Sequence, residues 1–223
     1  MGVEKAWEVV HGDCLSMLER MKGMRVDAVI SDPPYGMGWD TASKRFSGGQ
    51  RKPGDGRDDW GEIAGDDVPF DPTPWLDFPR VVLWGSNHYA ARLPVGTTLV
   101  WIKRADQNFQ TFLSDAEIGW MKGGHGVYCH RKQFPPPSRM FEAGGECAHA
   151  TQKPISLMKW CMEMAKVPEG GLVAAGGPGR ASLSGQAAAF SAWRGGVPPP
   201  GRPGHQAAGR CAGWPRPSRP GTP

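Results

Sequence analysis

The feature that most restricts how this chain can fold is an abrupt change in composition near residue 173. Residues 174–223 contain no acidic residue and no Lys, Ile, Met or Tyr, and consist largely of Gly, Ala, Pro, Arg and Ser. Their only aliphatic side chains larger than alanine are Leu183 and Val197. Such a segment cannot bury enough apolar surface to offset the entropy lost on folding, so it predicts a disordered tail. The folded part is therefore expected within residues 1–173.

The charge and cysteine content of the chain restrict its partners and its location. The formal net charge is +4, but six arginines and no acid lie beyond residue 173, so residues 1–173 hold 20 basic residues against 22 acidic ones. Overall basicity therefore gives no sign of a nucleic-acid partner. No apolar run approaches the roughly 18 residues of a membrane span, so no membrane association is expected. The charged N-terminus and five cysteines without paired spacing favour a cytoplasmic location.

Strand patterns alternate with helix patterns in residues 1–173. Strands are predicted in EVV, VDAVISD, RVVLW, TTLVWIK and DAEIGWM, with helices after the first and third. A further helix is predicted in ISLMKWCMEMAK, whose apolar residues at 155, 157, 158, 161, 162 and 165 share one face. This alternation predicts the α/β class with a mostly parallel sheet. The polar stretch 40–70 is predicted to be either a plain surface loop or a loop over a substrate cleft.

The six residues SDPPYG at 31–36 follow the apolar run VDAVI. At the carboxyl end of a parallel strand, Asp32 and the carbonyl of Pro33 would face the crevice where α/β proteins bind ligands. Pro33 and Pro34 hold the backbone rigidly, and Tyr35 offers a flat ring with a polar tip. Two acceptors beside an aromatic plane suit a planar heterocycle that carries an exocyclic amine. The alternative is a structural turn with Asp32 as its cap.

VDAVISDPPYG resembles the catalytic motif of the β-class amino-methyltransferases, which use S-adenosylmethionine (SAM) to methylate exocyclic amines of DNA bases. HGDCL at 11–15 resembles the turn near the SAM adenosine, and HATQKP at 149–154 resembles the motif that lines the SAM pocket, with Ala150 in place of proline. The order of the motifs also resembles that class, over residues 7–173 and in a phage-type form. The resemblance implies a Rossmann-like doubly wound sheet. It also implies a SAM site that includes Asp13, Cys14, Thr151, Gln152 and Lys153.

The family's mechanism, as the resemblance implies it, is direct methyl transfer to a base flipped out of double-stranded DNA. Asp32 and the Pro33 carbonyl would bind the amine, and Tyr35 would stack on the base. The Asp-Pro-Pro-Tyr form favours N6 of adenine, with N4 of cytosine as the alternative. The target-recognition region would fall at about 121–148, where phosphate contacts are expected from Arg131, Lys132 and Arg139. A solvated loop is the alternative reading of that region, and a homodimer is one option for the assembly.

The chain departs from the family after the TQKP helix. The family continues with a strand that ends in Asp-Pro-Phe and a glycine loop for SAM, whereas this chain has PEGGLV followed by AAGGPGR. The resemblance therefore ends near residue 173, as in a truncated or frameshifted enzyme with an incomplete sheet. Unpaired strand edges and poor SAM binding are expected, and a non-catalytic remnant that binds DNA weakly is the alternative. The spacing of the His and Cys residues matches no standard zinc pattern, so no metal is predicted.

Overall fold

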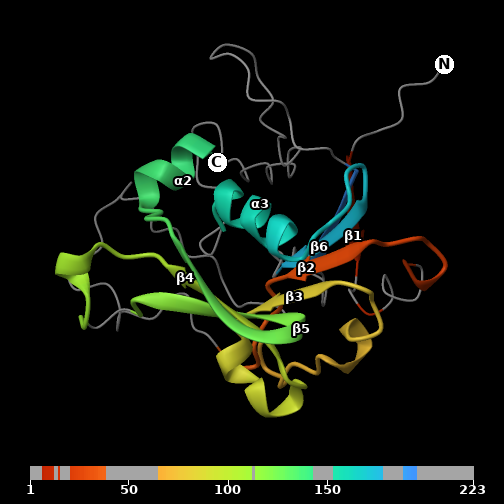
Figure 1. Cartoon of the computed structure of the whole chain (residues 1–223), viewed down its shortest axis with the longest axis horizontal. Helices are drawn as coiled ribbons and strands as arrows, with labels where there is room; N and C mark the ends of the chain where they lie inside the picture. Colours follow the sequence, from red (N-terminus) through yellow and green to blue (C-terminus); the bar gives the residue numbers. More distant parts are fainter. Residues whose placement is uncertain are drawn as a thin grey trace, which may run out of the picture.

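The computed structural model describes residues 7–12, 15, 21–38, 65–111, 114–142, 153–177 and 188–194. Most of the predicted loop at 40–70 lies outside these residues, as do Asp13, Cys14, Thr151 and Gln152. The described part forms a mixed α/β fold in which helices pack on a twisted sheet (Figure 1). None of the helices in these ranges is long and apolar enough to cross a bilayer.

Seven strands form one mixed sheet in the order β1-β7-β6-β2-β3-β5-β4. Strands β2 (Ala28–Ser31), β3 (Val81–Trp84) and β6 (Leu172–Gly177) form its parallel centre. Val29 pairs with Val81 on one side, and Ala28 pairs with Val173 on the other. Strands β1 (Trp7–Gly12) and β7 (Ala188–Arg194) continue the sheet at one edge. Strands β5 (Ala116–Arg131) and β4 (Gly96–Ile102) continue it at the other edge.

The central strands are buried on both faces, because every residue of β2 and β3 is buried. Side chains alternate along a strand, so consecutive residues enter different cores. Val29, Val81 and Leu83 pack with Trp75 and Phe78 from the segment around the 3-10 turn η2 (Thr73–Trp75). Ile30, Val82 and Trp84 pack instead with Leu157 and Cys161 of α3 (Ile155–Met164). Figure 1 shows α3 on one side of the sheet and the segment with η2 on the other.

Several predicted elements are confirmed. Strands occur in all five predicted segments, and the predicted helix at 155–165 is α3. Three details differ from the expectation. The sheet is mixed and not mostly parallel, because β5 runs antiparallel to β3 and β7 runs antiparallel to both β1 and β6. The helix expected after β3 is a pair of short 3-10 turns, η3 (Ser86–His88) and η4 (Ala90–Arg92). Ile155, placed on the apolar face of α3 by its spacing, is exposed because it lies at the very start of the helix.

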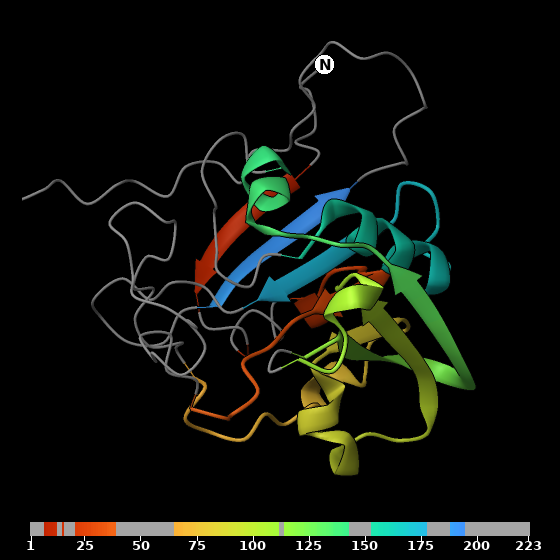
Figure 2. The same cartoon turned by 90° about the vertical axis from the view of Figure 1, so that its left-hand side faces the viewer.

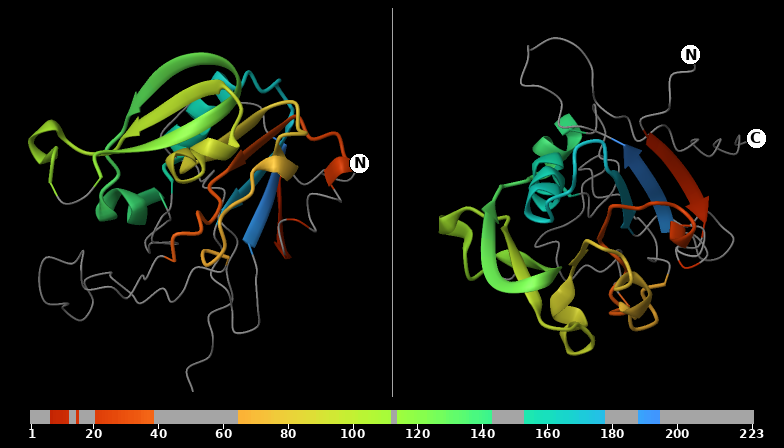
Figure 3. Two further views of the ribbon diagram at one scale, coloured as in Figure 1. Left: turned by 90° about the horizontal axis from the view of Figure 1, so that it is seen from below. Right: turned by 45° about the vertical axis from the view of Figure 1, so that its right-hand side comes forward.

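Strand β5 is much longer than the predicted DAEIGWM segment and bends around β4. Its first half, 116–121, pairs with β3 and with β4 in antiparallel register. Its second half, 127–131, runs parallel to 98–102 of β4, on the other side of that strand. The bend falls at Gly123 and Gly124, which both have positive φ, a conformation that glycine adopts without steric cost. Figure 3 shows the long strands β4 and β5 together, at the edge of the sheet away from β1.

The prediction of a disordered tail from residue 174 is wrong for two segments. Strand β6 continues to Gly177, and residues 188–194 form β7, which pairs antiparallel with both β6 and β1 (Figure 2). The antiparallel directions of β1 and β7 are visible on the right of Figure 3. The expected unpaired edges between β1 and β2 are therefore absent among the described strands. The physical reason is that strand pairing uses backbone groups, so an edge accepts a strand even when its sequence is poor in aliphatic residues.

Candidate functional site

Asp32 lies immediately after β2, at the carboxyl end of the parallel strands. Its backbone N–H donates to the carbonyl of Gly176 at 2.9 Å, and the Ser31 hydroxyl donates to the same oxygen at 3.0 Å. The end of β6 therefore fixes the backbone of Asp32. The buried run AVIS followed by the Pro33–Pro34 pair explains why the strand stops here, because proline has no N–H to donate to the sheet.

The turn that follows is held by Asp66, a residue that the sequence did not single out. One oxygen of its buried carboxylate accepts the backbone N–H groups of Tyr35, Gly36 and Met37 at 2.9, 2.9 and 3.3 Å. Gly36 has φ +77°, and a Cβ there would lie 2.4 Å from the carbonyl oxygen of Val68. The segment around Asp66 therefore packs directly against the turn and leaves room only for glycine at position 36.

Tyr35 is fixed at both its hydroxyl and its ring. The hydroxyl donates to Oδ1 of Asp32 at 2.5 Å, and the ring stacks on His88 at 4.8 Å between centroids with planes 7° apart. The Tyr35 ring also lies against Gly85, where only glycine fits, because a Cβ at that position would lie 1.9 Å from the ring. Burial, and secondarily the Asp32 carboxylate, raise the pKa of Tyr35 well above its usual range, so the phenol remains a neutral donor. His88 covers one face of the Tyr35 ring.

A partly buried chain of alternating charges continues from Asp32. The ammonium of Lys153 lies 2.6 Å from Oδ2 of Asp32 and 3.0 Å from Oε2 of Glu117, and the ammonium of Lys103 lies 3.0 Å from Oε1 of Glu117. Burial by itself would raise the pKa of Glu117, but the two ammonium groups lower it to about 2. Burial likewise opposes the charge of Lys153, yet Asp32 and Glu117 raise the pKa of Lys153 above its usual range. The four groups therefore form a charge-balanced cluster.

The chemistry of this cluster centres on a carboxylate that keeps acceptor capacity. A carboxylate has about four lone-pair positions, and Asp32 uses one on each oxygen for Tyr35 and Lys153. The remaining lone-pair positions can accept hydrogen bonds from a ligand. The side chain of Asp32 is 13% exposed. The site thus places a nearly buried acceptor next to a fixed aromatic ring.

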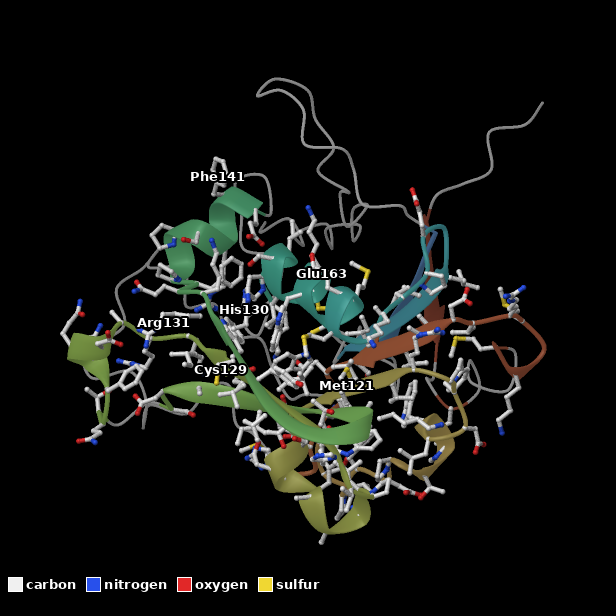
Figure 4. The ribbon with its side chains drawn as sticks, in the orientation of Figure 1. Met121, Cys129, His130, Arg131, Phe141 and Glu163 are labelled. Carbon is white, nitrogen blue, oxygen red and sulfur yellow. The ribbon has the colours of Figure 1, made fainter. Side chains whose placement is uncertain are left out.

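Two of the residues predicted to contact DNA follow one another at the end of β5, and the third lies on the next helix. Arg131 ends the outer half of β5, where it forms an ion pair with Asp106 of η5 (Asp106–Asn108) and lies over the Phe109 ring (Figure 4). Lys132 follows it and is exposed, while its backbone N–H donates to Ile102. Arg139 is partly exposed on α2 (Pro136–Glu142). The structure therefore places these three basic residues at the end of β5, directly after it, and on α2.

The residues predicted to bind SAM are only partly described. Asp13, Cys14, Thr151 and Gln152 lie outside the described residues, and only Lys153 is placed. The ammonium of Lys153 was expected to bind the carboxylate of SAM. In the structure it contacts the carboxylates of Asp32 and Glu117. Strand β6 ends in LVAAGG without the acid and phenylalanine of the family motif. The predicted SAM site therefore stays a prediction, because four of its five residues lie outside the described part of the chain.

Three further residues of the site were not predicted from the sequence, although each has a recognisable sequence signal. Glu117 is an acid inside an otherwise apolar strand pattern, Asp66 belongs to the pair Asp66–Asp67 ahead of a proline-rich stretch, and His88 follows a glycine at a strand end. Among the described residues no group of three His, Cys, Asp or Glu side chains could hold a metal ion. Comparison of the chain with protein family models, with curated proteins and with solved structures gave no match.

Proposed function

We propose that this chain carries the base-amine site of a SAM-dependent DNA methyltransferase directed at N6 of adenine. The observation that carries the proposal is the arrangement of Asp32, Pro33 and Tyr35 at the carboxyl end of a buried parallel strand, where α/β proteins bind ligands. The likeness of DPPYG, HGDCL and HATQKP to the β-class motifs supports it. In the structure β6 and β7 lie between β1 and β2, and β7 runs antiparallel to both of its neighbours.

The proposed roles follow from hydrogen-bond capacity. An exocyclic amine has two N–H groups, which Asp32 and the Pro33 carbonyl would accept. This draws the nitrogen lone pair out of conjugation with the ring and makes it available for alkylation. Stacking of the Tyr35 ring on the base would have to use the face opposite His88, which covers one face of the ring. The base must leave the duplex to reach these groups. No covalent enzyme intermediate is required.

The methyl donor enters the proposal only through the resemblance. SAM would supply an electrophilic methyl group, but β6 ends without the acid and phenylalanine of the family motif. We therefore expect weak SAM binding by the isolated chain, with Kd of about 1 mM or higher. Isothermal titration measures this directly, and micromolar binding would show that the chain contains a complete cofactor site.

Methyl transfer tests the proposed reaction. Genomic DNA from a host that lacks adenine and cytosine methylases serves as substrate, because it contains every short recognition sequence. The DNA is incubated with labelled SAM at millimolar concentration and its bases are separated by mass spectrometry. N6-methyladenine is expected with the wild type and not with Asp32→Ala, while Glu163→Gln, an exposed change on α3, should retain activity. N4-methylcytosine would replace the adenine assignment by the cytosine alternative.

The non-catalytic alternative rests on two observations of its own. Lys153 is engaged by two carboxylates, and β6 lacks the family's acid. It predicts no labelled base with either the wild type or Asp32→Ala. That result, obtained with correctly folded protein, would overturn methyl transfer as the function of this chain.

A further inference from the structure

Glu117 is the second residue of β5 and has no part in the roles implied by the family motifs. Its two carboxylate oxygens lie 3.0 Å from the ammonium groups of Lys103 and Lys153. β5 runs antiparallel to β3, so it begins at the edge of the sheet where β2, β3 and β6 end. Glu117 therefore stands at the same edge as Asp32, on the opposite side of Lys153.

Lys153 lies between the two carboxylates in a nearly dry environment. Its side chain is 10% exposed, compared with 13% for Asp32 and 26% for Glu117. An ammonium removed from water needs close counter-charges, and Lys153 has one on each side. With only one of the two, the flexible four-carbon chain of lysine could turn toward solvent. Two partners fix the position of the ammonium in a way that one partner does not.

We infer that Glu117 is a positioning residue that anchors Lys153, so that the Lys153 ammonium stays on Oδ2 of Asp32 and holds that carboxylate in place to accept the amine. The inference rests on the proposed function for the last step only. Lys103 completes the arrangement, because it balances the second charge of the two carboxylates. Lys153 thereby acts on the acceptor, in place of the SAM contact that the TQKP likeness implies for it.

The chemical reactivity of Lys153 tests the anchoring without any activity. Brief treatment with acetic anhydride, followed by peptide mass spectrometry, gives the acylation rate of each lysine. An ion-paired, buried ammonium with a raised pKa reacts slowly, because only the neutral amine attacks. Lys159, which is exposed on α3, supplies the reference rate. Lys122, whose ammonium is held by the carbonyls of Leu76 and Phe78, reports that the fold is retained.

In Glu117→Gln, the acylation rate of Lys153 relative to Lys159 is expected to rise about tenfold or more, as for a fall of one pKa unit. Lys103 should also react faster, which shows that the shared contact is lost, while Lys122 stays unchanged. The exposed change Glu163→Gln should alter none of these rates. A rise of less than about twofold at Lys153, with Lys103 accelerated and Lys122 unchanged, would overturn the inference, because Asp32 alone would then hold the ammonium.

A second arm separates this inference from the proposed reaction. If the wild type methylates DNA, Glu117→Gln should lower kcat about tenfold or more with little change in the KM for DNA, since the amine acceptor is disturbed and the DNA contacts are not. An unchanged kcat would overturn the positioning role even if Lys153 became reactive. If no variant methylates DNA, the proposed reaction and the positioning role fail together, while the acylation rates still decide whether Glu117 anchors Lys153.

Discussion

Two ion pairs of the same chemical kind show how burial decides what a charge does in this molecule. Lys153 and Asp32 pair at the inner edge of the sheet with side chains 10% and 13% exposed, whereas Arg131 and Asp106 pair on the outer strand with side chains 53% and 75% exposed. Water solvates both partners of the outer pair when they separate, so breaking that pair should cost little free energy. The inner pair is shielded from water, so water cannot readily replace either partner when the pair is broken. Its charges are fixed parts of the candidate site.

The largest effect is expected from removing the inner cation. Lys153→Met leaves the nearly buried Asp32 without an ammonium and Glu117 with Lys103 alone, so the free energy of unfolding should fall by about 3–5 kcal/mol. Urea unfolding followed by tryptophan fluorescence measures the loss. Lys159→Met on the exposed side of α3 is the control, with a change of less than about 0.5 kcal/mol. If both variants lost the same free energy of unfolding, burial would not explain the contribution of Lys153.

The acid dependence of stability should carry the signature of Glu117. Lys153 and Lys103 lower the pKa of Glu117 from 4.5 to about 2 against the effect of burial, so ionised Glu117 stabilises the folded state fully above pH 4.5. That contribution is lost as the pH falls from 4.5 toward 2. Between pH 6 and pH 3 the wild type should lose about 2 kcal/mol more than Glu117→Gln. Urea titrations at several pH values measure the difference, and parallel curves would contradict the assignment.

The smallest effect is expected at the outer pair. Arg131→Ala should change the free energy of unfolding by less than about 1 kcal/mol, because both partners are well solvated. If Arg131 contacts a DNA phosphate, the slope of log K for DNA binding against log salt concentration should also become shallower by about 1 in the variant. Binding measured at several salt concentrations gives that slope. An unchanged slope would exclude Arg131 from the DNA contact, and a large loss of stability would show that exposure is a poor guide here.

Local patterns were enough to place the central strands and the motif between them. Runs such as AVIS and VVLW are apolar on consecutive positions, as expected for strands buried on both faces, and prolines mark the end of the first. The position of Asp32 at a strand end therefore followed from neighbouring residues. The helix expected after β3 did not form, since its glycine and polar residues support only short 3-10 turns.

Contacts between distant segments could not be predicted in the same way. Lys153 and Asp32 are 121 positions apart, and Glu117 belongs to an edge strand whose length and bend were not apparent from its pattern. Asp66 supports the Tyr35 turn from a segment in which only a loop was expected. Strand β7 was missed because its place depends on two unpaired strand edges and not on its own composition.

The sequence by itself determined where the sheet has its buried centre and which residues end its middle strand, because burial on two faces and proline chemistry act within a few positions. Tertiary structure alone decided that Asp32 forms an ion pair with Lys153 and that Lys153 forms a second ion pair with Glu117. Buried charges must find their partners across the fold, and lysine and glutamate side chains are long enough to meet from elements that share one sheet edge. Their pairing is therefore a property of strand order, which no single segment encodes.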